Sequence, residues 1–171
     1  MSSISPVAFT VFGFNVHWYS LAYVVGIFIA TEVTTKLATK LKTEFSPKLI
    51  NDFISYAIIG IIFGGRAGHV LFYDFPYYSQ YPQDIIKVWK GGMSFYGGFL
   101  GVMISTFIFC KIRKIDFFKF IDLWTVSVPI GLFLGRIANF INGELLGKPT
   151  NVIWGVKFGN ESIMRHPSQI Y

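Results

Sequence analysis

FISYAIIGIIFGGRAGHVLF, residues 53–72, is the stretch that decides the fold. It carries one permanently charged side chain, Arg66, and an apolar run of this length crosses about 30 Å of hydrocarbon as a helix. Glycine recurs at every fourth position, at Gly60, Gly64 and Gly68, and such rows of small residues let membrane helices approach closely. The stretch therefore predicts a transmembrane helix that packs tightly against another.

Three further apolar runs have the length of a membrane span: residues 18–35, 92–109 and 120–141. The chain as a whole is 53% hydrophobic and only 14% charged, whereas soluble domains carry roughly 25% charged residues. We therefore expect an all-α fold, a polytopic helical membrane bundle with about four transmembrane helices. Residues 1–171 are expected to form a single membrane domain.

The positive charges predict how the bundle is oriented. Basic residues crowd the loops after the first and third spans (Lys36, Lys40, Lys42 and Lys48; Lys111, Arg113, Lys114 and Lys119), whereas residues 1–17 contain none. Loops rich in lysine and arginine stay on the cytoplasmic side. We expect the N-terminus and the tail 143–171 outside, in a multi-pass membrane protein. The net charge of +6 then belongs to these loops, and no nucleic-acid partner is expected.

Neither a metal nor a cofactor is expected. Cys110 is the single cysteine, which excludes an internal disulfide and a CxxC site. No group of His, Asp and Glu has the spacing of a metal site. Residues 1–20 have neither the basic start nor the small-residue cleavage site of a signal peptide, so the first apolar run is expected to remain as a helix.

GRIANFINGELLG, residues 135–147, is the main candidate for a functional site. Arg136, Asn139, Asn142 and Glu144 leave an apolar helix within nine residues, and an arginine at membrane depth is by default a functional-site hypothesis. Arg136 and Asn139 share a helix face. The alternative is a structural ion pair between Arg136 and Glu144, with Asn142 ending the helix before a Gly143 C-cap.

The predicted topology brings distant polar residues to one depth. At 1.5 Å per residue, Arg66 lies about 20 Å and Arg136 about 24 Å from the cytoplasmic starts of their spans. Tyr19 and Tyr96 stand near outer span ends, and the tail carries His166, the histidine best placed for chemistry. Arginine binds phosphate through a bidentate fork, so this outer layer suits a lipid headgroup. For Arg66, snorkelling or pairing with a carboxylate is an equal alternative to ligand binding.

Five motifs in order resemble those of the prolipoprotein diacylglyceryl transferase family. They are HWYSLAYVVG (17–26), GGRAGHVLFYDFP (64–76), GGMSFYGGFLG (91–101), GRIANFINGELLG (135–147) and RHPSQIY (165–171). The resemblance implies transfer of the diacylglyceryl group of phosphatidylglycerol to the lipobox cysteine of prolipoprotein signal peptides, in the plasma (inner) membrane of a bacterium. A thioether forms and glycerol phosphate leaves.

Carried over by position, Tyr19, Arg136, Asn139, Glu144 and Gly147 match the family's essential or lipid-binding residues. Arg66, Tyr96 and His166 are candidates from their depth and chemistry. The expected catalytic residues are Arg136, Tyr96, Tyr19 and Glu144. The expected lipid-binding residues are Arg136, Asn139, Gly147, Arg66 and His166.

The chain departs from the family pattern at two points. Family members usually have histidine where this chain has Tyr96, and a phenol ordinarily titrates near pH 10, against about 6.5 for imidazole. Family members also continue past the RHPSQIY motif with further helices, so the chain corresponds to the N-terminal portion of a longer fold. The alternative function is an inactive lipid-binding remnant or a small non-catalytic membrane protein.

Overall fold

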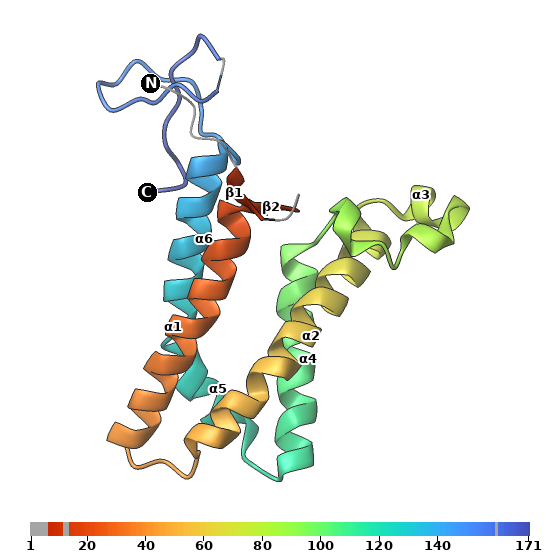
Figure 1. Ribbon diagram of the computed structural model, residues 1–171, viewed down its shortest axis with the longest axis vertical. Helices are drawn as coiled ribbons and strands as arrows, with labels where there is room; N and C mark the ends of the chain where they lie inside the picture. Colours follow the sequence, from red (N-terminus) through yellow and green to blue (C-terminus); the bar gives the residue numbers. More distant parts are fainter. Residues whose placement is uncertain (1–6, 12–13, 160) are drawn as a thin grey trace. The chain divides into compact units, whose positions relative to one another are not determined.

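The computed structural model describes residues 7–11, 14–159 and 161–171, which are mostly helical (Figure 1). The elements in order are β1 (Val7–Val11), β2 (Phe14–His17), α1 (Trp18–Lys40), α2 (Pro47–Phe72), α3 (Phe75–Gln80), the 3₁₀ helices η1 (Pro82–Asp84) and η2 (Val88–Lys90), α4 (Phe95–Arg113), α5 (Phe117–Thr125) and α6 (Val128–Asn142). The predicted helical membrane bundle is confirmed at the level of fold class. A short antiparallel hairpin of β1 and β2 precedes it, which the sequence analysis did not predict.

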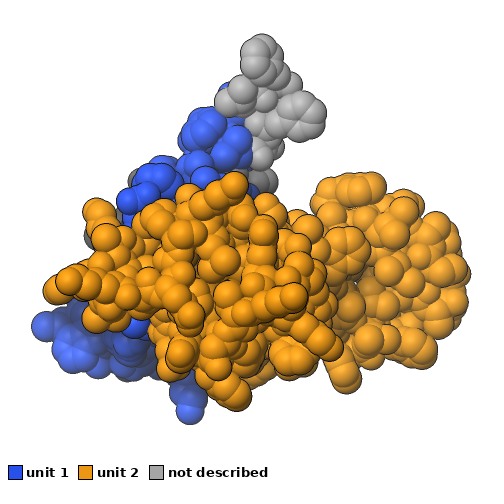
Figure 2. Space-filling view, turned by 90° about the horizontal axis from the view of Figure 1, so that it is seen from below, with its two compact units in different colours: residues 1–33, 125–171 blue, residues 34–124 orange. Residues whose placement is uncertain are grey.

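The chain forms two compact units, which Figure 2 shows in different colours. The first consists of residues 1–33 and 125–171, and the second of residues 34–124. The expectation of a single membrane domain stays a prediction.

The membrane spans match the four apolar runs, with one interruption. Within the described residues, α1, α2 and α4 are each long and apolar enough to cross a membrane. The helices α5 and α6 reach the length of a membrane span only when they are counted together as one broken span. Pro129 explains the break, because a proline cannot donate to the carbonyl four residues earlier and its ring clashes with it. That carbonyl belongs to Thr125, the last residue of α5. The expected continuous helix over 120–141 is therefore two helices.

The second unit is built on the pair α2 and α4, which run side by side (Figure 1). Glycines face each other along this pair: a Cβ on Gly60 would lie 2.6 Å from the Gly101 carbonyl oxygen, and one on Gly64 would run into the Gly97 carbonyl. The predicted close approach is confirmed here. Gly131 and Gly135 of α6 differ, because a Cβ on either would meet nothing within 4 Å; their glycine spacing therefore marks no tight contact.

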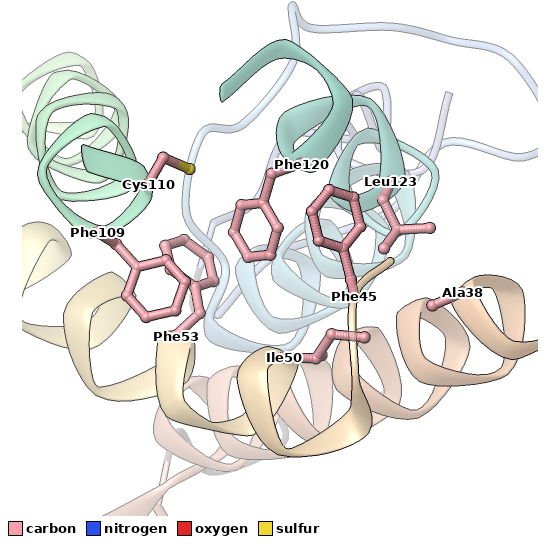
Figure 3. Close-up of a cluster of buried hydrophobic side chains, with 8 residues drawn as sticks. All are labelled: Ala38, Phe45, Ile50, Phe53, Phe109, Cys110, Phe120 and Leu123. Carbon is pink, nitrogen blue, oxygen red and sulfur yellow. The ribbon is translucent and has the colours of Figure 1, made fainter. Parts of the chain in front are cut away.

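Aromatic side chains fill the core where α2 begins and α4 ends (Figure 3). The Phe53 ring packs edge-on against Phe120 at 5.1 Å between centroids and in a tilted arrangement against Phe109 at 5.4 Å. Such aromatic pairs contribute about 0.5–1.5 kcal/mol beyond the area they bury. Cys110 is buried in the same cluster.

Candidate functional site

The C-terminal end of α6 carries the polar cluster of the first unit. Gly143 follows the helix in the left-handed conformation, with φ of 67°, and its N–H donates to the carbonyls of Asn139 and Phe140. The predicted Gly143 C-cap is confirmed. Because the chain reverses here, the Glu144 N–H also donates to the Asn139 carbonyl, at 2.9 Å, and the Glu144 side chain lies beside the helix end.

Two amides hold the Glu144 carboxylate. Asn139 Nδ2 donates to one oxygen at 2.9 Å and Asn142 Nδ2 to the other at 3.2 Å. A carboxylate at a helix C-terminus faces the negative end of the helix dipole, so these two donors offset an unfavourable field. Asn139 is buried, whereas Glu144 is exposed. The two amides therefore hold the exposed Glu144 carboxylate in a fixed orientation at the end of the helix.

Arg136 lies one turn earlier in α6 and is exposed. Its guanidinium forms no hydrogen bond or ion pair within the described part of the chain, so the structural Arg136–Glu144 pair considered from the sequence is not formed there; the partners of Glu144 are asparagines instead. An arginine without a hydrogen-bond or ion-pair partner has all five N–H donors available to a ligand.

The tail folds back so that two of the sequence motifs lie against each other. Gln169 Nε2 donates to the Glu144 carbonyl at 2.5 Å, and Ser168 Oγ donates to the Leu145 carbonyl at 3.0 Å. At Gly147 the backbone approaches the His166 carbonyl so closely that a Cβ would overlap it. Gly147 is thus required for the contact between residues 144–148 and 165–169.

His166 belongs to a short hydrogen-bonded chain of ring side chains. Its Nδ1 lies 2.9 Å from the Tyr171 hydroxyl, which accepts from Trp154 Nε1 at 2.9 Å. Because indole only donates, the Tyr171 oxygen accepts from Trp154, and its own proton remains available for a hydrogen bond to His166 Nδ1. Sequence reasoning missed Gln169, Tyr171 and Trp154 as parts of this arrangement; only Gln169 and Tyr171 carried a signal, through their place in the RHPSQIY motif.

Two buried amide oxygens in this region accept no hydrogen bond from the described residues. They are Asn142 Oδ1 and Gln169 Oε1. An unsatisfied buried acceptor costs about 1–3 kcal/mol, so each of these oxygens would gain from a hydrogen-bond donor.

The second unit carries the other candidates, Arg66 and Tyr96. Arg66 is 4% exposed, and its five N–H groups face the carbonyls of the loop between α3 and α4: Ile85 at 2.8 Å, Asp84 at 2.6 Å, Lys87 at 3.4 Å, Gly91 at 2.5 Å and Gly92 at 3.1 Å. Tyr96, in the first turn of α4, is 71% exposed. A carboxylate partner for Arg66 is not formed among the described residues, because backbone carbonyls take its donors; snorkelling stays an untested alternative.

Asp84 organises the same loop from its other side. Its carboxylate accepts from Lys87 Nζ at 2.6 Å, from Lys90 Nζ at 2.9 Å and from the Tyr77 hydroxyl at 2.6 Å. The hydrogen bonds from Lys87, then Tyr77 and Lys90, hold the pKa of the Asp84 carboxyl well below its usual range. The hydrogen bond to Asp84 raises the pKa of the Tyr77 phenol. At neutral pH, the ionised Asp84 carboxylate therefore stabilises the loop through these three hydrogen bonds.

The candidate residues divide between the units. The first unit contains Arg136, Asn139, Glu144, Gly147 and His166, with Asn139 against Glu144 and Gly147 against His166, whereas Arg66 and Tyr96 belong to the second. Their convergence on one layer, and the role of each, stay predictions. The side chain of Tyr19 lies outside the described residues. Among the described residues, no group of three or more His, Cys, Asp and Glu could hold a metal ion.

Several helices of this chain are long and apolar enough to cross a membrane, and one of them ends in a polar cluster. These features define a multi-pass integral membrane protein. The sequence model of the prolipoprotein diacylglyceryl transferase family matches residues 6–171. The chain belongs to this family.

Relatives named phosphatidylglycerol–prolipoprotein diacylglyceryl transferase match nearly the whole chain. That of Rickettsia felis is 51% identical over 170 residues, that of Rickettsia typhi 50% over 172 and that of Rickettsia canadensis 49% over 170. The alignments cover 99%, 100% and 99% of this chain, respectively. The chain spans 66% of the length of each of these relatives.

Proposed function

We propose that the protein transfers the diacylglyceryl group of phosphatidylglycerol to the lipobox cysteine thiol of prolipoproteins, the first step of lipoprotein maturation. The observation that carries this proposal is the end of α6, where Arg136 has no partner among the described residues and Glu144 is held by two amides. Phosphodiester recognition at the headgroup level needs such a free guanidinium fork. Membership of the transferase family supports the same activity.

The reaction exchanges one bond to a glyceryl carbon for another. The cysteine sulfur forms a C–S bond as the C–O bond to the phosphate breaks, and glycerol phosphate leaves with the bonding electrons while the thiol proton passes to a base. Arg136 is proposed to bind the phosphate oxygens as negative charge grows on them. Removing one preorganised donor of this kind costs about 3 kcal/mol or more in the transition state.

The remaining candidates take supporting roles in this proposal. Glu144, Tyr96 and Tyr19 are proposed at the reacting centre, where one of them accepts the thiol proton. Asn139 is proposed to lie at the lipid headgroup, because its amide donates to the Glu144 carboxylate and thereby orients it. Gly147 and His166 are proposed to line the lipid site, because the close contact between them brings His166 next to residues 144–148.

The proposed location is the plasma (inner) membrane of a bacterium, with the site at the outer face. The lysine-rich loop between α1 and α2 and the basic residues at the end of α4 support this orientation, because such loops remain cytoplasmic. Phosphatidylglycerol then reaches the site from the outer leaflet, and the lipobox peptide from an exported precursor.

A vesicle assay tests the proposal. The purified protein is reconstituted in vesicles containing phosphatidylglycerol or only phosphatidylethanolamine, and thioether formation on a lipobox peptide is followed by mass spectrometry. We expect product only with phosphatidylglycerol, and none with a peptide whose lipobox cysteine is serine. Equal product in phosphatidylethanolamine alone would refute the substrate, and phosphatidylglycerol binding without any product would indicate a non-catalytic lipid-binding protein.

A further inference from the structure

We propose that Arg66 is a positioning residue, which fixes the start of α4 and thereby presents Tyr96, and that it is not a ligand of the lipid phosphate. The inference rests on the proposed function insofar as Tyr96 belongs to the reacting centre. Its structural part, the clamp that Arg66 forms on the loop, can be tested without any activity.

The hydrogen bonds of Arg66 carry the argument. A guanidinium has five N–H donors and no acceptor, and every nitrogen of Arg66 donates to backbone carbonyls between residues 84 and 92. The Tyr78 ring covers the guanidinium at 4.9 Å, a favourable cation–π contact. No donor remains for a phosphate unless the loop first releases the side chain.

The charge of Arg66 is stabilised without a carboxylate. Asp84 contributes only its main-chain carbonyl to Arg66, because its side chain is engaged by Tyr77, Lys87 and Lys90. Among the described residues, the guanidinium therefore donates to carbonyl dipoles and lies against the Tyr78 ring. Charged side chains inside membrane proteins are known to pair with backbone carbonyls in this way.

Gly91 and Gly92 let the loop reach the guanidinium. Their φ angles are 84° and 79°, and residues other than glycine rarely adopt such positive φ values. A Cβ on Gly92 would lie 2.6 Å from the His69 ring and 3.1 Å from Arg66 Nη1. The double glycine is thus the point at which the chain passes over Arg66 before it enters α4.

The clamp continues directly into the first turn of α4. The buried Ser94 donates its N–H to the Gly65 carbonyl at 2.8 Å, next to Arg66 in α2, and its hydroxyl caps α4 by accepting from Gly97 N at 3.1 Å. Tyr96 follows two residues later. Arg66 and Gly65 together therefore set where α4 begins and in which direction Tyr96 leaves it.

Arg66→Lys separates positioning from ligand binding. Lysine keeps the positive charge, but its three donors radiate from a single nitrogen and cannot span carbonyls from residue 84 to residue 92. Arg113→Lys is the matched control: Arg113 lies at the opposite end of α4, where it pairs with Asp52 at 2.7 Å, and its side chain is 44% exposed.

The experiment measures amide hydrogen exchange and steady-state kinetics of the full chain in vesicles that contain phosphatidylglycerol. For Arg66→Lys we expect exchange of residues 85–97 to rise at least tenfold and kcat to fall at least tenfold, with KM for phosphatidylglycerol changed less than twofold. Arg113→Lys should change none of these. A tenfold rise in KM with unchanged exchange would make Arg66 a lipid ligand and overturn the proposal.

Gly92→Ala attacks the same clamp from the loop side and leaves Arg66 intact. It should reproduce the faster exchange of residues 85–97 and the loss in kcat, and it decides the question if Arg66→Lys does not fold. Unchanged exchange in Gly92→Ala would refute the clamp. If the wild-type protein shows no transfer, the exchange data still test the clamp, and the failure then belongs to the proposed function.

Discussion

An alanine at Gly60 should destabilise the contact between α2 and α4, and the structure gives the magnitude. Its Cβ would lie 2.6 Å from both the Gly101 carbonyl oxygen and Ser105 Oγ, and 2.9 Å from the Gly101 carbonyl carbon. Backbone atoms cannot rotate away as side chains do, so the helices must separate by several tenths of an ångström. Overpacking of this kind costs about 1–3 kcal/mol.

Gly131→Ala is the matched control within the same chain. A Cβ at Gly131 meets nothing within 4 Å, and alanine favours a helix interior over glycine by roughly 0.5–1 kcal/mol. The same chemical change is therefore expected to destabilise at one position and to be neutral or stabilising at the other.

The assay is reversible unfolding in mixed micelles, with increasing SDS and the loss of near-ultraviolet circular dichroism as the readout. We expect the Gly60→Ala midpoint to fall and the Gly131→Ala midpoint to stay or rise. If both variants shift equally, or Gly131→Ala falls further, the close α2–α4 approach is not what stabilises this unit.

Three further predictions test other parts of the account. With Cys110 replaced by alanine, an impermeant thiol reagent on intact cells should label Ser79→Cys and not Thr43→Cys; labelling of Thr43→Cys alone would invert the topology. The lowered pKa of Asp84 means that its ionised form stabilises the loop at pH values above the ordinary 3.8 and that this stabilisation is lost as the pH falls from there through the lowered pKa. Amide protection of residues 81–92 should therefore hold at pH 5 and decline below pH 3.8, whereas Asp84→Asn should lower protection at pH 5 and remove the decline; an unchanged pH profile in Asp84→Asn would contradict this. Gly147→Ala, whose Cβ overlaps the His166 carbonyl, should loosen the tail and speed proteolysis between residues 148 and 165, while Gly135→Ala, at a helical position of α6 with open space around its Cβ, should alter the cleavage rate less.

Much of the fold could be predicted from the sequence because membrane spans depend on uninterrupted apolar length. The runs that became α1, α2 and α4 carry this signal in full, and the Gly60 and Gly64 row predicted a close contact. The break before α6 was missed although Pro129 marks it: the apolar run continues through the proline, and composition alone does not register a lost backbone hydrogen bond.

The site was harder to predict, because backbone groups decide much of its geometry. Arg66 was identified as unusual, but its partners are backbone carbonyls of a loop, and the side chains of that loop do not indicate where its carbonyls point. The Arg136–Glu144 pair was a reasonable alternative from charge alone. Gly143 instead turns the chain so that Glu144 meets Asn139 and Asn142, and a charge pattern cannot show such a turn.

The most direct test of the central claim is the rate of diacylglyceryl transfer by Arg136→Lys in vesicles of phosphatidylglycerol. Lysine retains the charge but loses the bidentate fork, so the account predicts a fall in kcat/KM of about 10²-fold or more with the yield of folded protein unchanged. Arg136→Lys with most of the wild-type rate, together with a lower folded yield in Arg136→Ala, would contradict the claim and give Arg136 a structural role.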